Sequence, residues 1–531
     1  MCGILGGFAA TPLERRRVNA AFELIEHRGP DAASVVYHQN DRVLLAHRRL
    51  KVVDLDDRAN QPMRSACGRY EIIYNGEIYD FDRLRSLVPD YPFKTSGDTE
   101  VILALYAAYG ADMLPRLNGM FAFAIYDHER GELFLARDRF GIKPLYFSAR
   151  PDAVLFCSEI PPLLKLTGRA EPDLNSIKSY LATGVYDFGV HTFFDGITRL
   201  EAGCCATLKL SDLKLESRRW YQVTDFATQS ESLGDDEIGE RLDDIFANAV
   251  RRHLMADVAV GVNISGGLDS SALLHYVNRY HQHIQGFTQD YVPPYSERPW
   301  VEQAARDTGA VSNFIMIEAE QALDAFTRAM RYQAEPYGGI PVIGFDFLYQ
   351  RAEEKGITVL LDGNGVDEVL LGYKKYHLAY LAESRGQGAY ADRLADFSAF
   401  WDEEPKQVES AVARMSNNAG AAIDGTISVH ADALGSALTH AEIRHPELPE
   451  STGDRVRDLA IADMVASKIP RALRFNDRVS MMHSKELRVP FLDPELVEFS
   501  LALPTERLLN REARSDWTSA AAALIRGRAP L

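Results

Sequence analysis

Cys2 is the first residue of this 531-residue chain whose type and position could do chemistry. Because a small second residue permits removal of Met1, the thiol could stand beside its own free α-amine. Such an amine has an ordinary pKa of about 7.7–8.0 and could take the thiol proton. One residue would then supply both a nucleophile and a general base. A cysteine at position 2 is more often structural, so this interpretation requires substrate-binding groups elsewhere in the chain.

Two glycine-rich loops in the C-terminal half could hold phosphate groups. The loop SGGLDSS, residues 265–271, follows the apolar run VAVGVNI and precedes a helix-forming stretch. Hydroxyls and backbone amides at the start of a helix suit a phosphate ligand. The loop lacks the lysine of a GxxxxGK[ST] sequence, which argues against chemistry at a γ-phosphate. A second strand-like run enters a glycine-rich loop within GITVLLDGNGVDEVLLGYKKYH, residues 356–377, and supports the same interpretation.

These residues need elements to position them, and the chain shows two different patterns. Residues 1–205 contain short β-branched and aromatic runs between turn residues, such as RVLLAH, YEIIYNGEIYD, GMFAFAIYD and GELFLARD. This spacing predicts an α+β domain of stacked antiparallel sheets with a few helices, at 14–26 and 99–109. Residues 206–236, which end in a polar and acidic stretch, are expected to be a linker region. Residues 237–531 alternate helix-period segments with short apolar strands, which predicts an α/β domain with a parallel sheet covered by helices.

The overall composition limits the class of partner. A formal net charge of -18 opposes binding to nucleic acid or to an anionic membrane surface. No apolar run approaches the roughly 20 residues that span a bilayer, so we expect a cytoplasmic protein with small-molecule ligands. A homodimer is compatible with these expectations. The five cysteines have no CxxC spacing and predict neither a disulfide framework nor a zinc site: Cys2, Cys67, Cys157, Cys204 and Cys205.

An ordered set of motifs identifies the N-terminal half by resemblance. The set comprises MCGI, HRGPD at 27–31, AHRRLKVVD at 46–54, YNGEIYD at 74–80, SGDTE at 96–100 and LARDRFGIKPLYF at 135–147. It resembles class II, N-terminal-nucleophile glutamine amidotransferase domains, which implies that this half hydrolyses glutamine. In that family pattern Cys2 is the nucleophile, and Asn75 with the Gly76 amide stabilises the tetrahedral oxyanion.

The same resemblance implies how glutamine is bound. Arg49 would bind the α-carboxylate, and Asp98 with Glu77 would receive the α-ammonium. The backbone of Leu50, Lys51, Val52 and Val53 would line the pocket.

The C-terminal half resembles the adenylating domain of asparagine synthetase B-type enzymes. The loop at 265–271 resembles their pyrophosphate loop, 356–377 resembles SGxGxDExxxGY, and FNDRVSMMHSKELRVPFLD at 475–493 resembles DRxSMxxSxExRxPFLD. The resemblance implies ATP and magnesium as cofactors, with Asp269 and Asp367 as the metal ligands. The expected ATP-binding residues are Ile264, Ser265, Gly266, Gly267, Asp269, Ser270, Gln289, Asp362 and Gly363.

The two resemblances together predict glutamine-dependent, ATP-driven amidation of a small-molecule carboxylate. The reaction would form AMP and pass through an acyl-adenylate, which ammonia from glutamine attacks. The residues Arg478, Ser480, Glu486 and Arg488 would either brace the floor of the ATP site or form a buried polar network without a catalytic role.

The chain departs from the asparagine-forming pattern at the place where the acceptor is expected. Relatives that make asparagine carry a glutamate in the middle of SGEGSDE, whereas this chain has Asn364. Asn313 lies near the position of an expected histidine. The sequence ends RGRAPL before the family's terminal R-x-K lysine. Lys374 and Lys375 are therefore candidates for a cation near the α-phosphate, although solvated surface charges are the commoner role of lysine.

Three hypotheses follow from these departures. The chain amidates a carboxylate other than aspartate, or it makes asparagine with compensated residues. Alternatively it is a glutaminase or binding subunit with a degenerate synthetase half. Pyrophosphate release with candidate carboxylates separates the third hypothesis from the first two.

Overall fold

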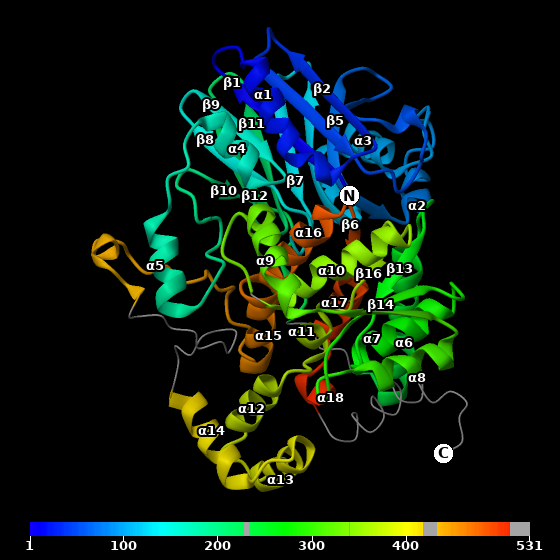
Figure 1. The fold of residues 1–531 in the computed structure, drawn as a ribbon, viewed down its shortest axis with the longest axis vertical. Coiled ribbons are helices and arrows are strands. Elements are labelled where there is room, and N and C mark those ends of the chain that lie inside the picture. The colour runs from blue at the N-terminus through cyan, green and yellow to red at the C-terminus, as the bar shows by residue number, and fades with distance from the viewer. Residues whose placement is uncertain (228–232, 339, 418–432, 510–531) are drawn as a thin grey trace.

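The computed structural model describes residues 1–227, 233–338, 340–417 and 433–509 (Figure 1). Its N-terminal part contains two stacked, antiparallel, six-stranded sheets. The first has the order β10-β8-β9-β1-β3-β2, with β1 (Gly3–Ala9), β2 (Ala32–His38), β3 (Val43–Arg49), β8 (Tyr146–Arg150), β9 (Ala153–Cys157) and β10 (Thr198–Arg199). The second has the order β12-β11-β7-β6-β5-β4, with β4 (Met63–Arg64), β5 (Tyr70–Tyr79), β6 (Asn118–Asp127), β7 (Glu132–Arg137), β11 (Cys204–Lys209) and β12 (Leu215–Arg219).

Both faces of β5 are buried, because the second sheet lies between the first sheet and α3. Ile73 packs between the sheets, while Ile72 and Tyr74 pack on the outer side against the core that includes α3. Strand residues alternate between the two faces, so Asn75 and Glu77 share the inner face with Ile73. The helices of this part are α1 (Arg15–Phe22), α2 (Phe81–Arg85), α3 (Asp98–Tyr109), α4 (Ile160–Thr167) and α5 (Leu174–Thr183).

The segment expected as a linker, residues 206–236, carries strands of the second sheet. Strand β11 pairs antiparallel with both β7 and β12, so the sheet continues to residue 219. The next helix, α6 (Asp235–His253), already packs in the C-terminal part.

The C-terminal part has a parallel five-stranded sheet of order β15-β14-β13-β16-β17. Its strands are β13 (Val260–Asn263), β14 (Gln285–Asp290), β15 (Val311–Met316), β16 (Val359–Leu361) and β17 (Glu486–Arg488). The remaining helices are α7 (Leu268–Asn278), α8 (Arg298–Thr308), α9 (Ala319–Gln333), α10 (Ile340–Glu354), α11 (Val366–Leu370), α12 (Lys374–Glu383), α13 (Tyr390–Trp401), α14 (Pro405–Asn417), α15 (Arg455–Val465), α16 (Lys468–Met482), α17 (Pro494–Ala502) and α18 (Thr505–Leu509). Within the described ranges, no helix has the length and hydropathy to cross a bilayer.

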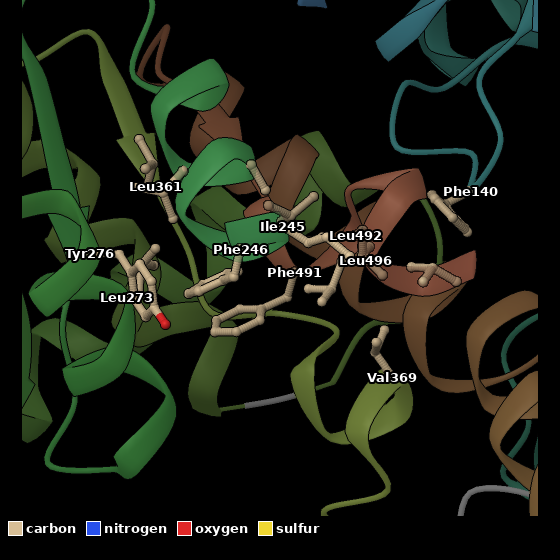
Figure 2. Packing of buried hydrophobic residues seen from close by; sticks show 14 of the residues in the cluster. Phe140, Ile245, Phe246, Leu273, Tyr276, Leu361, Val369, Phe491, Leu492 and Leu496 are labelled. Atoms are coloured by element: carbon tan, nitrogen blue, oxygen red, sulfur yellow. The ribbon is translucent and has the colours of Figure 1, made fainter. Parts of the chain in front are cut away.

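One hydrophobic core joins the two parts. Figure 2 shows Phe246 of α6 against Phe491, and their ring centroids lie 4.3 Å apart in a stacked arrangement. The same cluster extends to Phe140, Leu50 and Met120 of the N-terminal part. Burial of apolar surface on both sides therefore holds the two parts in one arrangement. Helix α16 lies between them in Figure 1 and carries polar contacts to the N-terminal part.

Candidate active sites

Cys2 lies directly before β1, on the side that faces the second sheet. Alternate residues of β1 point to one side, and Ile4 and Phe8 belong to the core between the sheets. The Cys2 backbone N–H donates to Asn75 Oδ1 at 2.9 Å, and Sγ lies 3.9 Å from the Leu50 carbonyl oxygen. Burial raises the pKa of the thiol, against the opposing effect of the chain's terminal ammonium. The thiol therefore needs a base before it can act as a nucleophile.

Met1 fills the space next to Cys2. It is 1% exposed, and its ammonium donates to Glu486 Oε2 at 2.8 Å. Removal of Met1 would turn the Cys2 backbone nitrogen, which Asn75 now binds, into a free α-amine. It would also free Glu486 from this ion pair and open the space beside the thiol.

Asn75 offers an unused donor at the same place. It is buried, and within the described part of the chain its Nδ2 has no hydrogen-bond partner. A Cβ at the next residue, Gly76, would lie 2.1 Å from the Met120 carbonyl oxygen, so only glycine lets β5 approach β6 this closely. A buried amide without a partner is costly, which indicates that a ligand oxygen completes the site.

Glu77 and Asp98 place two buried carboxyl groups near each other. Asp98 begins α3, and its Oδ2 accepts hydrogen bonds from Tyr74 Oη at 2.7 Å and the Ile78 N–H at 2.9 Å. Glu77 Oε1 has no hydrogen-bond partner among the described residues. Burial, and then the charge of Asp98, raises the pKa of Glu77 well above its ordinary value. Two buried carboxylates this close favour a cationic ligand such as an α-ammonium.

Arg49 ends β3 and binds the loop that follows it. Its Nη1 donates to the Asp56 carbonyl at 2.9 Å and to Asn60 Oδ1 at 2.8 Å. Its Nη2 donates to the carbonyls of Val53 and Asp54. The guanidinium thus holds the loop in place, and its contact with a substrate carboxylate stays a prediction.

The expected lining residues after Arg49 differ in what they contact. The Leu50 carbonyl faces the Cys2 thiol. Lys51 Nζ pairs with Asp57 at 2.9 Å on the exposed side of the loop. The Val52 carbonyl accepts from the Asp257 N–H at 2.9 Å, so it is used in the contact between the two parts.

Strand β17 of the C-terminal part closes the Cys2 site. Arg488 Nη2 lies 3.4 Å from Glu77 Oε2, and Arg488 Nε donates to Glu486 Oε1 at 2.7 Å. Burial opposes ionisation of Glu486, but the Met1 ammonium and Arg488 lower its pKa to about 2. The motif residues 486 and 488, expected at the ATP site or in a buried network, therefore lie against the Cys2 site.

A cavity of about 670 Å³ lies at the carboxyl ends of β13, β14 and β16. Ligands of parallel α/β sheets bind at this edge. Its lining includes the expected residues Ile264, Ser265, Asp269, Ser270, Gln289, Asp362, Gly363 and Asp367.

The loop between β13 and α7 has the form of an anion cradle. The Ser265 N–H donates to Ser270 Oγ at 3.0 Å, and Ser270 Oγ donates to the Ser265 carbonyl at 2.8 Å. Gly267 is the residue before the first turn of α7, and the Gly266 N–H donates to Glu297 Oε2 at 3.1 Å. A carboxylate oxygen thus sits where the loop would bind a phosphate oxygen.

Asp269 of α7 and Asp367 of α11 both line the cavity. Burial and then the charge of Asp367 raise the pKa of Asp269 to about 6. Burial also raises the pKa of Asp367. Two half-buried carboxyl groups in one cavity suit a hard divalent cation, which prefers oxygen ligands.

The rest of the lining combines polar and apolar side chains. Asn263 Nδ2 donates to Asp362 Oδ2 at 2.7 Å, and Gln289 Oε1 accepts from Tyr291 Oη at 2.8 Å. Phe345 and Leu348 of α10 add an apolar wall that no sequence motif indicated.

Two further lining residues, Lys468 and Arg471, come from the first turns of α16. They lie just before the motif at 475–493, and only their spacing of three residues on a helix could have placed them on one face. Lys374 and Lys375, the candidate cations, form ion pairs with Glu403 and Asp463 and are not part of the lining.

Comparison with known proteins identifies a family for each part of the chain. Residues 1–221 match the family model described as a glutamine amidotransferase domain, and residues 241–522 match the model described as asparagine synthase. A putative glutamine-hydrolyzing asparagine synthetase of Mycobacterium tuberculosis is 30% identical, over 96% of this chain and 83% of the relative.

Two other relatives span most of the chain at lower identity. Amidase chry2 of Gibberella zeae is 27% identical over 96% of this chain and 82% of its own length. Asparagine synthetase 1 of Bacillus subtilis is 27% identical over 95% of this chain and 82% of its own length. With both family models in order and a relative at this identity, the chain belongs to the glutamine-hydrolysing asparagine synthase family.

Proposed function

We propose that this enzyme transfers ammonia from glutamine to a small-molecule carboxylate in an ATP-driven reaction. The Cys2 site would release the ammonia, and the cavity at 264–269 and 362–367 would activate the acceptor. One hydrophobic core joins the two parts of the chain. The observation that carries the proposal is that these parts hold a buried thiol, beside unpartnered Asn75 and Glu77 atoms, and a cavity lined by the carboxyl groups of Asp269 and Asp367.

At the Cys2 site the chain's own groups account for hydrolysis. After removal of Met1, the α-amine takes the thiol proton and the sulfur attacks the carboxamide carbon of glutamine. Asn75 Nδ2 and the Gly76 amide receive the developing oxyanion, and Glu77 with Asp98 holds the α-ammonium. Ammonia leaves with the transferred proton, and water then releases glutamate from the thioester.

At the cavity, the acceptor carboxylate attacks the α-phosphorus of ATP and pyrophosphate leaves. Ammonia then attacks the acyl carbon, and AMP leaves as the amide forms. The 265–271 loop would bind the departing diphosphate through its amides and hydroxyls. Asp269 and Asp367 would hold magnesium, which neutralises charge on the phosphates.

We also propose that the glutaminase domain ends after β12 and that the synthetase domain begins with α6. The pairing of β12 with β11 supports the first boundary, and the packing of α6 in the C-terminal core supports the second.

The test is mass spectrometry of products after incubation with glutamine, ATP, magnesium and pooled carboxylic acids. The proposal expects glutamate, AMP, pyrophosphate and a new amide. Asp269→Asn and Asp367→Asn should each remove pyrophosphate formation and leave glutamine hydrolysis, because neutral amides bind magnesium poorly. Formation of glutamate without AMP or pyrophosphate, with every carboxylic acid in the pool, would contradict the proposal.

A further inference from the structure

Three side chains that can bind a metal ion converge at one end of the stacked sheets, away from both candidate sites. His38 is the last residue of β2 in the first sheet. Glu71 is the second residue of β5 in the second sheet, and His128 directly follows β6. One ligand atom from each of these residues lies within 4.8 Å of the others. The cluster therefore joins elements of both sheets.

The cluster lies at the opposite end of the strands from Cys2. His38 pairs with Val43, which pairs with Phe8 near the end of β1, whereas Cys2 precedes the start of that strand. On β5, the glutamate of the cluster precedes Asn75 by four residues, which is about 13 Å at the rise of a strand. A role of the cluster is thus separate from the chemistry at Cys2.

Both imidazole rings approach the same carboxylate oxygen. His38 Nε2 lies 2.8 Å and His128 Nε2 lies 2.9 Å from Glu71 Oε2. His38 Nε2 is buried and forms no hydrogen bond with a described residue, so a hydrogen bond does not account for its approach to the carboxylate. The ligand atoms of a tetrahedral zinc ion lie about 3.3 Å apart, because the Zn–N and Zn–O distances are about 2.0–2.2 Å. The three side chains are therefore close to the spacing of a zinc site.

The types and the burial of these side chains also suit zinc. The side chain of Glu71 is 8% exposed, and those of His38 and His128 are 19% and 22% exposed. A buried carboxylate needs a positive charge beside it. Two imidazoles and one carboxylate form a ligand set that zinc binds, with water in the fourth position. The partial exposure of the two rings gives solvent access to that position.

The backbone around each histidine is held in place by its neighbours. Gln39, which follows His38, donates from Nε2 to Tyr126 Oη at 2.9 Å. The His128 N–H donates to the Arg69 carbonyl at 3.0 Å. The ring centroids of the two histidines lie 4.8 Å apart in an edge-on arrangement. Ligands that are positioned before binding lose little conformational freedom, which favours binding of a metal ion.

One cation competes for the same place. Arg64 Nη2 lies 3.2 Å from His128 Nε2, the nitrogen that also faces Glu71. The lone pair of this nitrogen can accept from the guanidinium or bind a metal ion, but it cannot do both. Arg64 is exposed, so its side chain can turn to solvent and exchange this contact for water at small net cost.

We propose that His38, Glu71 and His128 bind a zinc ion that joins the first sheet to the second. The three residues supply two nitrogen atoms and one oxygen atom, and water completes the coordination. The cysteine spacing predicted no zinc site, and this site uses no cysteine. Its ligands come from three separate elements, so no short motif indicates it. The inference goes beyond the proposed function and does not depend on it.

The test is a zinc titration of the full chain after a chelator has removed bound metal. Excess magnesium competes for sites made of carboxyl groups, so that zinc reports on sites with nitrogen ligands. The parent protein should bind zinc, and its Tm should rise with the zinc concentration. Cobalt in place of zinc should give the strong visible absorption of a tetrahedral ion.

Variants of the three ligands identify the site. His38→Ala, Glu71→Gln and His128→Ala should each weaken zinc binding by about 100-fold or more, because loss of even an outer-shell partner costs about 10-fold to 100-fold. They should also remove the increase in Tm. His281→Ala and Cys67→Ser are the matched controls, because both residues are exposed and lie outside the cluster. Both controls should bind zinc like the parent.

Arg64→Leu gives a result that a failure to fold cannot produce. Loss of the competing guanidinium should tighten zinc binding by about 2-fold to 10-fold, the net contribution of one hydrogen bond. An Arg64→Leu variant that binds zinc no more tightly than the parent would overturn the inference. Zinc binding that survives in all three ligand variants, or that is lost in Cys67→Ser, would also overturn it. A parent protein that binds no zinc would show that the cluster is an ion-pair network only.

Discussion

Asn75 allows a direct test of the glutamine site at the scale of one residue. Asn75→Ala removes an unpartnered donor that we assign to the oxyanion, so kcat for glutamine hydrolysis should fall by about 100-fold to 1000-fold with little change in KM. Glutamate release measures both constants. The exposed Asn19 on α1 serves as the control, and Asn19→Ala should behave like the parent. A raised KM with unchanged kcat would mean that Asn75 binds the ground state instead.

Asp269 gives the ATP site a pH dependence. Its pKa is raised from 3.8 to about 6, so the folded apo protein prefers the protonated carboxyl and loses stability as pH rises through this range. Magnesium needs the ionised form. The increase in Tm caused by magnesium should therefore be large at about pH 7.5 and disappear as pH falls below about 6. In Asp269→Asn the increase in Tm caused by magnesium should be small at every pH. An increase in the parent protein that does not change with pH would contradict the assignment of Asp269 as a magnesium ligand.

At the scale of elements, α6 packs against α7, α17 and the turn at 490–492 that follows β17. Phe246 is 6% exposed and stacks on Phe491. Phe246→Ala should lower the free energy of unfolding by about 3–5 kcal/mol, because it leaves a cavity in a packed core. Denaturant unfolding measures the change. The control is Leu323→Ala on α9, where Leu323 is 71% exposed; it should change the free energy of unfolding by less than about 0.5 kcal/mol. Equal effects of the two substitutions would show that α6 is not part of the common core.

The strands and helices with a clear pattern of apolar residues could be predicted from the sequence. The apolar runs of β5, β6 and β7 appear as expected, and α3 begins at Asp98, one residue before the predicted start. Strand β12 was predicted as linker because it is a mostly exposed edge strand with the sequence LESRR, which has no apolar alternation. An edge strand that packs on one neighbour carries little signal in its own residues.

The residues of the two candidate sites likewise divide into those that the sequence could predict and those that it could not. Motifs predict groups that lie close in sequence, such as the 265–271 loop with Asp269. They could not predict that Glu486 and Arg488 face Cys2 and Glu77, since these contacts join residues separated by hundreds of positions. Lys468 and Arg471 were missed because a lysine and an arginine on a helix are usually solvated, and only the packing of α16 turns them into the cavity.

At the scale of the whole molecule, two separate sites predict separable activities. Cys2→Ala should abolish glutamine-dependent synthesis and keep synthesis from ammonium salts, because the cavity of the C-terminal part contains none of the Cys2 site residues. Pyrophosphate release with each nitrogen source measures the two activities. Cys157→Ala is the control and should retain both, because this buried cysteine packs in the core that includes Leu5, on the opposite face of β1 from Ile4. Loss of ammonium-dependent synthesis in Cys2→Ala would show that the sites are not independent.

The burial of Met1 beneath Glu486 sets an order of events during biosynthesis. An aminopeptidase can reach Met1 only before the folded chain buries it. Glu486, which binds the Met1 ammonium in the folded protein, is translated long after Met1 has left the ribosome. Trimming of the nascent chain therefore has to come first. A molecule that completes its fold untrimmed keeps its methionine buried beside Cys2 and shields it from the peptidase, so late processing cannot rescue it. The fraction of active enzyme in a cell would then depend on the rate of Met1 removal relative to the rate of translation.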